Sequence, residues 1–530
     1  MSDASGTTAA AGASTAPQKR GGFSSRKVFI FAAIGSAVGL GNIWRFPYVA
    51  YENGGGAFLI PYLVALFCAG IPFLYLDYAM GHRHGGSSPL TWARMRRWTE
   101  SLGWWHVMIC VVIAAYYAAI IAWAAKYTIF SVDKAWGDDA EGFFFGDFLH
   151  ADTSGLSFDF VPGILVPMVL IWIVVIAIMA AGVEKGIGLT SVIGIPVLVI
   201  AFGALVVQAL FLDGASVGLE AFFTPNWEAL THAGVWAAAF GQIFFSLSVG
   251  FGIMITYSSY MDRDTDMTGS GTVVGLANSS FELLAGIGVF AALGFMAQAN
   301  GVTVDEVASG GIGLAFIVFP TIISQAPGGA VIGVLFFGSL VLAGVTSLVS
   351  ILEVIISAVR DKMELGRVAA TMVVTVPIAV VSVLFFATAS GVAVLDIADY
   401  FINQFGILFA ALVAVVVLAW VLRKLPLLQR HLDARGSVKL RGWWPLLVGT
   451  VVPVALGYIF VESLKDTLDE TYGGYETWMV GIFGWGVAGG AIVLAVLLAL
   501  MPWRKGTSLE VPADRDLEPT PSPAQEGAQR

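Results

Sequence analysis

Two glycine pairs, each inside a long apolar run, are the residues of this sequence best suited to bind ions. Gly39 and Gly41 form the first pair, and Gly250 and Gly252 form the second. A helix that breaks at membrane depth leaves backbone N–H and C=O groups that something else must satisfy. The freed carbonyls can ligate a cation, and the N-terminus of the next half-helix can receive an anion. The pattern predicts a site for a carboxylate-bearing molecule beside Na⁺.

Small polar side chains flank both pairs: Ser36 and Asn42 around the first, and Ser246 and Ser248 before the second. A single glycine pattern of this kind is more typical of close packing, in which small residues let membrane helices approach. Two matched breaks beside hydroxyl or amide groups favour binding over packing. A dinucleotide-binding loop is excluded, because the third glycine of that motif is absent and no strand precedes it.

No group of residues in the sequence suggests catalysis. The six histidines include no HExxH pattern, which is the mark of a zinc protease helix. Cys68 and Cys110 lie in apolar runs without a nearby base, and two cysteines cannot form a disulfide framework or a cysteine-based zinc site. We therefore expect a protein that is not an enzyme.

The composition places these residues in a membrane. Hydrophobic residues make up 57% of the 530 residues, charged residues make up 12%, and the mean hydropathy is +0.82. A soluble domain carries about 25% charged residues. The net charge of −10 does not suggest nucleic-acid binding. We expect an integral membrane protein whose partner is the lipid bilayer and not a nucleic acid.

A helix needs about 20 apolar residues to cross a bilayer, and the sequence contains twelve such runs. They fall near 28–49, 55–81, 103–130, 162–181, 187–211, 234–260, 270–298, 329–358, 367–389, 400–422, 443–463 and 477–502. Lys and Arg gather in the two tails and the even-numbered loops, with the exceptions Arg45, Lys126, Lys134 and Lys465. Because positive residues mark cytoplasmic loops, both termini are predicted to be cytoplasmic and the protein to lie in the cell (plasma or inner) membrane.

The two breaks fall in the first and sixth spans, which are five spans apart. Because five is an odd number, the repeat that contains the second break is inverted in the membrane relative to the first repeat. Inverted repeats with broken helices at matching positions point to the central site of a transporter. The predicted organisation is a disordered tail (1–22), a first repeat (23–211), an extracellular loop (212–233), a second repeat (234–425), two further helices (426–503) and a second disordered tail (504–530).

The residues around the breaks resemble the neurotransmitter:sodium symporter family. The similarity is most specific in residues 35–47 (GSAVGLGNIWRFP) and 52–58 (ENGGGAF), and it continues at Tyr116-Tyr117, 246–252, Asn278 with Glu282, and 343–347. The resemblance covers about residues 20–500. Within the family, this sequence resembles the bacterial amino-acid transporters. It implies an all-α membrane protein of twelve helices with the leucine-transporter fold: a five-plus-five inverted repeat, helices 1 and 6 broken at the midplane, and two extra C-terminal helices.

By this resemblance the protein has two sodium sites. The first would use the carbonyl of Ala37, the side chains of Asn42, Ser246 and Asn278, and the substrate carboxylate. The second would use the carbonyls of Gly35, Val38 and Ala343 with the hydroxyls of Thr346 and Ser347. Neutral oxygens suit Na⁺, because they hold a hard cation without burying several carboxylates. Taken alone, Thr346 and Ser347 would more commonly bond back to their own helix.

The resemblance also implies a substrate pocket, in which Tyr117 donates to the substrate carboxylate. Its residues are Ala37, Leu40, Gly41, Ile113, Tyr117, Phe245, Ser246, Ser248, Phe251, Ser347 and Ile351. Members that carry monoamines have an acidic residue where this chain has Gly39, so the substrate must bring its own carboxylate. Because the pocket is uncharged, we expect a neutral, hydrophobic or aliphatic α-amino acid of the leucine, methionine or alanine type.

Charged residues at the two ends of the pocket match the gates of the family. Arg45 and Asp399, which precedes the tenth predicted span, match the extracellular ion pair. Arg20, Asp361 and Tyr260 match the cytoplasmic gate, where Phe23 replaces the usual tryptophan. The alternative for each charge is that it extends to the membrane interface.

Glu282 stands where chloride-dependent members have a neutral residue, so it predicts that chloride is not required. The resulting hypothesis is import of an amino acid with two Na⁺ ions by alternating access. The alternative is a sodium-dependent sensor or binding protein of the same fold that does not transport. The sequence leaves open whether a small accessory membrane subunit takes part.

Overall fold

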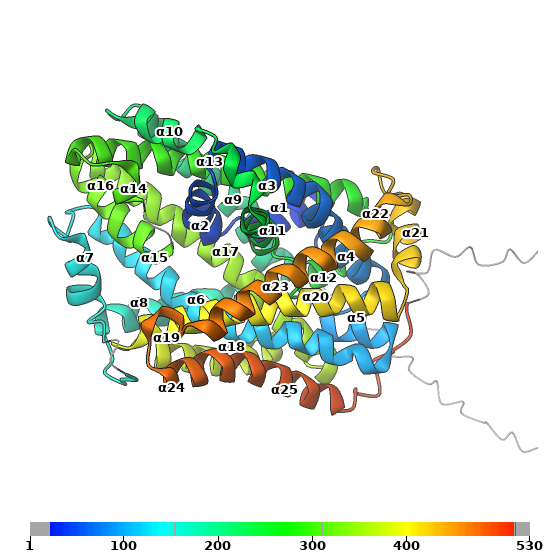
Figure 1. Ribbon diagram of the computed structural model, residues 1–530. Coiled ribbons are helices and arrows are strands. Elements are labelled where there is room, and N and C mark those ends of the chain that lie inside the picture. The colour runs from blue at the N-terminus through cyan, green and yellow to red at the C-terminus, as the bar shows by residue number, and fades with distance from the viewer. Residues whose placement is uncertain (1–21, 153–154, 309–310, 513–514, 516–530) are drawn as a thin grey trace, which may run out of the picture.

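The computed structural model describes residues 22–152, 155–308, 311–512 and 515. Within these residues the fold is helical, and the β-structure consists of two isolated bridges, Gly55 with Pro225 and Phe160 with Thr388. The long helices run in nearly one direction through the molecule (Figure 1). This layout is expected for a chain that must satisfy its backbone polar groups internally in lipid.

The α-helices follow one another along the whole described chain, and several join through short 3₁₀ or π-helical turns. In chain order they are α1 (Arg26–Ala37), α2 (Leu40–Glu52), α3 (Leu59–Ala65), α4 (Ile71–His84), α5 (Ser88–Met95), α6 (Glu100–Phe130), α7 (Ala140–Gly142), α8 (Pro162–Ala181), α9 (Leu189–Leu210), α10 (Ala215–Phe223), α11 (Ala233–Ser246), α12 (Ile253–Ser258), α13 (Met267–Asn300), α14 (Val304–Val307), α15 (Gly311–Gly313), α16 (Phe319–Gln325), α17 (Gly329–Met363), α18 (Arg367–Phe386), α19 (Gly391–Phe401), α20 (Leu408–Val416), α21 (Leu425–Arg435), α22 (Trp443–Leu446), α23 (Val452–Asp469), α24 (Thr477–Met479) and α25 (Val487–Leu500).

Among the described residues, ten helical segments are long and apolar enough to cross a membrane, or eleven if α1 and α2 count as one bent span. The sixth predicted span, 234–260, is divided between α11 and α12, and neither is long enough to cross alone. Twelve spans therefore stay a prediction. Large apolar side chains such as Ile173, Val197, Val373 and Leu494 are exposed on the outer helices, where lipid would cover them.

The chain leaves helical geometry at both predicted breaks. Helices α1 and α2 are bent by 53° around Val38 and Gly39, which are extended. Between α11 and α12 the chain takes positive φ at Ser248 (52°), Gly250 (84°) and Gly252 (92°). Glycine adopts this region readily, whereas other residues seldom do. The glycine spacing is thus what allows the second break to form.

Groups behind the second break satisfy its backbone. The carboxylate of Asp77 in α4 accepts from the N–H of Gly250 (3.2 Å), and the thiol of Cys110 in α6 donates to the carbonyl of Phe251 (3.5 Å). The unbroken helices α6 and α17 pack against each other, and α17 also packs against α1. The two breaks are therefore held against a wall of continuous helices.

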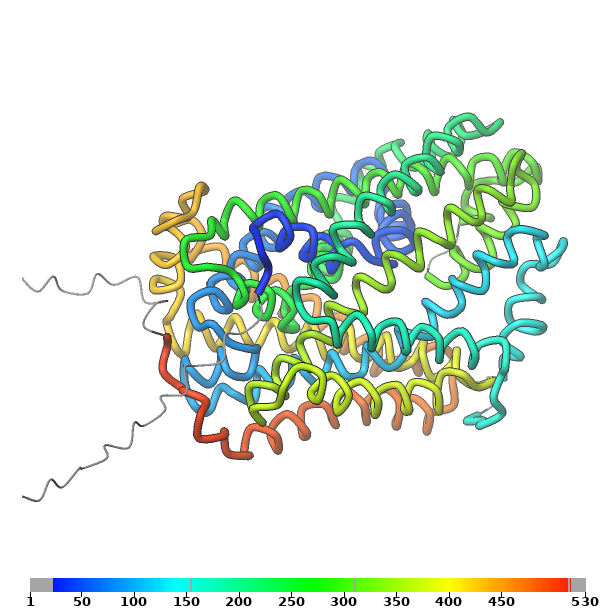
Figure 2. Tube along the Cα trace, turned by 180° about the vertical axis from the view of Figure 1, so that it is seen from behind, coloured from blue at the N-terminus to red at the C-terminus, as the bar shows by residue number. Residues whose placement is uncertain are grey.

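The two ends of the described chain meet at one end of the helices, which we call the terminal face. The backbone of Gly22 approaches the carbonyl of Tyr260, and Arg515 donates to the carbonyl of Ser259 (3.5 Å). Figure 2 shows the residues after α25, in red, running past this end of the molecule. We call the opposite end the distal face.

Three predicted boundaries differ from the structure. The tenth predicted span, 400–422, begins earlier, at Gly391, because no helix breaker lies between Gly391 and Phe401. Asp399 therefore lies inside α19 and not before the span. The predicted loop 212–233 contains the helix α10. The tail predicted to be disordered from Arg504 is packed against the terminal face through residue 512, because its polar groups find partners on several helix ends.

Candidate functional site

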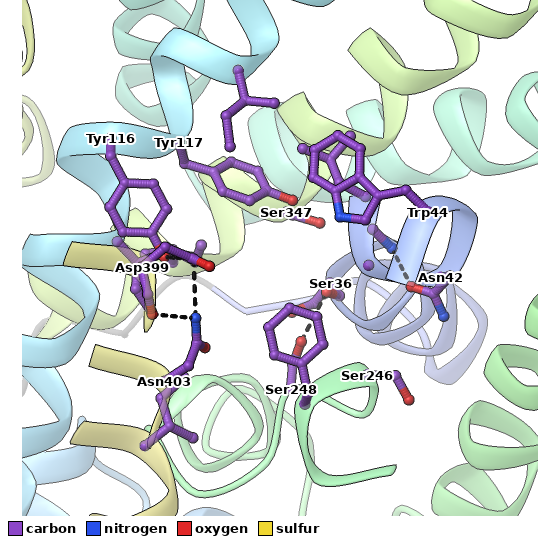
Figure 3. Close-up of a pocket in the computed structure, with 18 of the residues that line it drawn as sticks. Ser36, Asn42, Trp44, Tyr116, Tyr117, Ser246, Ser248, Ser347, Asp399 and Asn403 are labelled. Atoms are coloured by element: carbon purple, nitrogen blue, oxygen red, sulfur yellow. Dashed lines mark hydrogen bonds between the residues drawn. The ribbon is translucent and has the colours of Figure 1, made fainter. Parts of the chain in front are cut away.

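A cavity of ≈ 200 Å³ lies between the two breaks (Figure 3). It is lined by α1, α2, α6, α11, α12, α15, α17 and α19, by the turn after α19 and by the residues of the breaks. The structure brings all the residues predicted to surround the substrate to this one cavity: Ala37, Leu40, Gly41, Ile113, Tyr117, Phe245, Ser246, Ser248, Phe251, Ser347 and Ile351. Residues from both halves of the sequence therefore form one site.

One end of the cavity is suited to a carboxylate. Leu40 and Gly41 begin α2, where backbone N–H groups lack helical partners and favour an anion. The hydroxyl of Tyr117 lies within hydrogen-bonding reach of the Leu40 backbone and of the Ser347 side chain. A Cβ atom at Gly39 would lie 3.1 Å from Ser347 Oγ and 3.4 Å from Tyr117 Oη, so a larger residue at this position would crowd both hydroxyls.

The first set of predicted sodium ligands converges beside this end. Asn42 Nδ2 donates to Asn278 Oδ1 (2.8 Å), and Asn278 Nδ2 donates to Ser246 Oγ (3.0 Å). Asn42 Oδ1 accepts from the N–H of Gly39 (2.8 Å), which fixes the amide at the break, and Ala37 ends α1 next to it. The atoms that would coordinate the cation are neutral oxygens, which fit a hard monovalent cation. In the described residues no group of three or more His, Cys, Asp or Glu could hold a metal ion.

The second predicted set lies between α1 and α17. Ser347 Oγ donates to the carbonyl of Gly35 (3.4 Å), and Thr346 Oγ1 lies 3.0 Å from the carbonyls of Ala343 and Leu342. The bond to Leu342 lies within the helix of Thr346 itself. Such back-bonding is the alternative to a role of Thr346 as an ion ligand. Val38 lies in the break itself, one residue after α1. The geometry thus brings the predicted ligands of this set to one contact between α1 and α17.

Towards the distal face the cavity is bounded by Arg45 and Phe245. The Arg45 guanidinium lies over the Phe245 ring, 4.4 Å from its centroid. Asp399 accepts from Tyr116 Oη (2.5 Å) and from Asn403 Nδ2 (2.9 Å), and the described residues show no ion pair between Arg45 and Asp399. A second cavity of ≈ 450 Å³ lies beyond Arg45 and shares Phe245, Asn403 and Ile407 with the first. Arg45 thus lines the second cavity, Asp399 lines the first, and Phe245 lines both.

Towards the terminal face an aromatic cluster blocks the path. The ring of Phe23 lies edge-on to Tyr257 (5.3 Å between centroids) and to Tyr260 (6.2 Å). Tyr260 Oη donates to Glu353 Oε1 (2.5 Å), and Arg367 forms an ion pair with the same carboxylate (2.6 Å). These contacts join the end of α12 to α17 and α18, so this side is closed.

The remaining predicted gate residues lie at the terminal face or outside the described residues. Asp361 accepts from the N–H of Ser87 (2.9 Å) at the terminal face. Arg20 lies outside the described residues. Glu353 and Arg367 were not predicted as gate residues from the sequence. The signal that could have found them was Glu353, a glutamate within an apolar run.

Glu282 is fully buried next to the first set of ligands, one turn after Asn278. It accepts from Tyr62 Oη and from Gln242 Nε2 (2.7 Å). Tyr62 and Gln242 were also missed from the sequence, although each is a polar group inside an apolar run. The carboxylate thus places a fixed acidic group close to the predicted cation site.

These features define a class of protein: a multi-pass helical carrier with a central polar cavity between two broken helices. The sequence profile of the sodium:neurotransmitter symporter family matches residues 20–140 and 135–505. This chain belongs to that family. Its members are transporters and not enzymes.

Three relatives illustrate the range of the family. An uncharacterized sodium-dependent transporter of Methanocaldococcus jannaschii is 40% identical over 494 residues, which is 92% of this chain and 99% of the relative. The sodium-dependent serotonin transporter of Drosophila melanogaster is 29% identical over 87% of this chain and 79% of its own. The human sodium- and chloride-dependent neutral and basic amino acid transporter B(0+) is 28% identical over 91% of this chain and 86% of its own. The protein is a sodium-dependent transporter of this family.

Proposed function

We propose that the protein imports a neutral, hydrophobic or aliphatic α-amino acid of the leucine, methionine or alanine type together with Na⁺. The observation that carries this proposal is the composition of the cavity. Helix α2 begins at the cavity beside the Tyr117 hydroxyl, which suits a carboxylate, while Ile113, Phe251 and Ile351 offer an apolar wall to the side chain. One methylene changes such a fit by only about 1–3 kcal/mol, so the proposal is limited to a class of side chain.

Two Na⁺ ions accompany each substrate molecule in this proposal. The first is held by Ala37, Asn42, Ser246, Asn278 and the substrate carboxylate. The second is held by Gly35, Val38, Ala343, Thr346 and Ser347. Since the first ion and the substrate share the carboxylate, each should raise the affinity for the other.

The Na⁺ gradient and the membrane potential together supply enough free energy for concentrative uptake. One Na⁺ gains about 2.3 kcal/mol per 100 mV of membrane potential, and a tenfold concentration gradient adds about 1.4 kcal/mol. Two ions supply roughly 7 kcal/mol, which supports about 10⁵-fold accumulation of a zwitterion.

Glu282 makes chloride unnecessary in this proposal. Its carboxylate is buried beside the ligands of the first ion and accepts from Tyr62 and Gln242. A negative charge near the cation lowers the cost of burying it. In relatives that need chloride, the bound anion would have this role.

The proposal includes the orientation and the cycle. The terminal face is cytoplasmic, both termini included, and the twelve predicted spans form two inverted repeats of five with two further helices. Arg45 and Asp399 pair when the outer side closes, and Arg20, Asp361 and Tyr260 separate when the inner side opens. The contacts of Phe23 and Tyr260 support an inner side that is closed in this structure.

The test is uptake of labelled leucine, methionine and alanine into proteoliposomes under an inward Na⁺ gradient. Replacing Na⁺ with choline should abolish uptake, and replacing chloride with gluconate should leave it unchanged. Sodium-dependent binding without uptake would favour a sensor of the same fold. Neither uptake nor binding would contradict the proposed substrate class.

A further inference from the structure

Ser191 is a buried polar residue to which the proposed function gives no role. It lies in the first turn of α9 and is fully buried. Its hydroxyl has no hydrogen-bond partner among the residues that the structure describes. A serine inside a helix often bonds back to a carbonyl of the preceding turn, and a buried hydroxyl without any partner costs free energy. A bound ion that the hydroxyl contacts would offset this cost.

The Ser191 hydroxyl lies against the residue that begins the second set of predicted sodium ligands. A Cβ atom built at Gly35 would lie 3.4 Å from Ser191 Oγ and 3.1 Å from Ile195 Cδ1. Glycine at this position therefore lets α9 approach α1 closely. The same approach brings the hydroxyl next to the backbone of Gly35, whose carbonyl also accepts from Ser347 Oγ (3.4 Å).

The same face of α9 also reaches the second helix of this set. A Cβ atom built at Gly194 would lie 3.4 Å from Cγ2 of Thr346 in α17. Residues three and four apart lie on one face of a helix, so Ser191, Gly194 and Ile195 share a face. Helix α9 packs against both α1 and α17. The Ser191 hydroxyl thus lies beside the contact between α1 and α17 that gathers the second set.

Ser191 approaches this set from the side of the closed terminal face. Three residues before it, a Cβ atom built at Gly188 would lie 2.7 Å from Val28 Cγ1 and 3.9 Å from Phe23 Cδ1. Phe23 belongs to the aromatic cluster that blocks the path on this side. Helix α1 begins at the same face, so Gly35 is nearer to that face along the chain than the later ligand of this helix. An ion that leaves the second set towards the terminal face would therefore pass the Ser191 hydroxyl.

We propose that Ser191 is a further ligand of the second Na⁺, contributed by α9 from the terminal side. Its hydroxyl adds one neutral oxygen to the three carbonyls and two hydroxyls of the set. A hydroxyl can turn its lone pairs to a cation, and a neutral oxygen does so without burying another charge. This inference rests on the second sodium site of the proposed function and extends that site to a third helix.

The experiment measures binding of labelled Na⁺ to the purified full chain without an amino acid. In the proposed function the first ion needs the substrate carboxylate, whereas the second does not, so this measurement reports the second site. Ser191→Ala is compared with Thr371→Val as the matched control. The Thr371 hydroxyl is also fully buried without a hydrogen-bond partner in the described part of the chain, and it lies in α18, which contributes no predicted ion ligand.

We expect Ser191→Ala to bind Na⁺ about tenfold more weakly, the usual size of effect for one lost contact between a neutral group and a charge. Thr371→Val should bind Na⁺ as the unchanged chain does. Equal affinity in Ser191→Ala and the unchanged chain would overturn the proposal, as would an equal loss in the control.

Thermal unfolding separates an ion ligand from a residue that only supports packing. A ligand that binds the folded state raises Tm, so the rise in Tm on adding Na⁺ should shrink in Ser191→Ala and stay unchanged in Thr371→Val. Without Na⁺, Ser191→Ala should be at least as stable as the unchanged chain, because it removes an unpartnered buried hydroxyl. An equal fall in Tm with and without Na⁺ would indicate a packing role and overturn the proposal.

The outcome for Ser191 is distinct from the outcome for the substrate, because neither measurement needs an amino acid. Weaker Na⁺ binding in Ser191→Ala by a chain that takes up none of the three amino acids would support the ligand and contradict the proposed substrate class. An unchanged chain that binds no Na⁺ without an amino acid would contradict both the second site as proposed and the role of Ser191 in it.

Discussion

Asn42 connects the break in the first helix to Asn278 and, through it, to Ser246. Asn42→Ala removes a proposed ion ligand and the acceptor that fixes the N–H of Gly39. We expect the affinities for Na⁺ and for the amino acid to fall together by at least about tenfold, because the lost oxygen contact to the cation is comparable to a hydrogen bond to a charged group, which contributes about 1.5–3 kcal/mol. Equilibrium binding of labelled substrate at several Na⁺ concentrations measures both.

Ser339→Ala is the matched control for this substitution, because the Ser339 hydroxyl is buried in α17 and has no hydrogen-bond partner among the residues that the structure describes. Its affinities should equal those of the unchanged chain. Normal sodium-dependent binding in Asn42→Ala would contradict the first sodium site.

Substituting Glu282 tests whether its fixed carboxylate takes the place of a chloride ion from solution. Glu282→Ser leaves Tyr62 and Gln242 facing a small neutral group, and in the proposed function a chloride ion then takes the place of the carboxylate. We expect uptake by this variant to require chloride, whereas the unchanged chain should transport equally in chloride and gluconate. A variant that transports at the same rate in both anions would refute the proposed role of Glu282.

At the level of single residues, the sequence was most informative where the chemistry is local. Glycines and small polar residues close together along the chain indicated both breaks, and the family resemblance added the proposed ion ligands beside them. Glu353 with Arg367, and Glu282 with Tyr62, pair across different helices, so no local pattern shows these contacts. The available signal was that Glu282 and Glu353 are charged residues within apolar runs.

The start of α13 joins three elements through one carboxylate. Asp266 Oδ1 accepts from the N–H groups of Gly269 (2.9 Å) and Ser437 (3.0 Å), and Oδ2 pairs with Arg26 (3.3 Å). Burial raises the pKa of Asp266, but these hydrogen bonds and the nearby Arg26 outweigh it and hold the pKa below its usual range. The charged form is therefore the one that stabilises the fold.

Asp266→Ala should lower the free energy of unfolding by about 1 kcal/mol, the usual effect of losing an N-cap. Asp266→Asn should cost less, since asparagine is an equally good N-cap and loses only the charge. The contribution of Asp266 is present above the unfolded pKa of about 3.9 and is lost as the pH falls through the lower folded value. Thermal unfolding of the three proteins at pH 7 should separate them, and an Asp266→Ala protein as stable as the parent would contradict the assignment.

At the scale of elements, hydropathy predicted most of the long helices but not their ends. The helix containing Asp399 begins at Gly391, because nothing between these residues interrupts it. The polar segment after residue 503 looked disordered, since its own composition buries little. Its partners are the ends of α5, α6 and α17, and their proximity depends on the packing of the whole molecule.

For the molecule as a whole, the proposed stoichiometry has a measurable consequence. Two Na⁺ with one zwitterion move two positive charges per cycle, and about 60 mV is worth roughly 1.4 kcal/mol per charge. An increase of about 60 mV in inside-negative potential should therefore raise the accumulation limit about 100-fold. Uptake by proteoliposomes clamped with K⁺ and valinomycin measures this limit, and a tenfold change would indicate a single ion.

The cavity has a polar part and an apolar part, and this division affects which substrate preferences can be engineered. In the proposed function, the start of α2 and the Tyr117 hydroxyl bind the carboxylate, which every α-amino acid has, while Ile113, Phe251 and Ile351 contact the side chain, in which amino acids differ. Neither Ile113 nor Ile351 is a proposed ion ligand. Substitutions at these two isoleucines are therefore expected to change the preferred solute and to leave its coupling to Na⁺ intact.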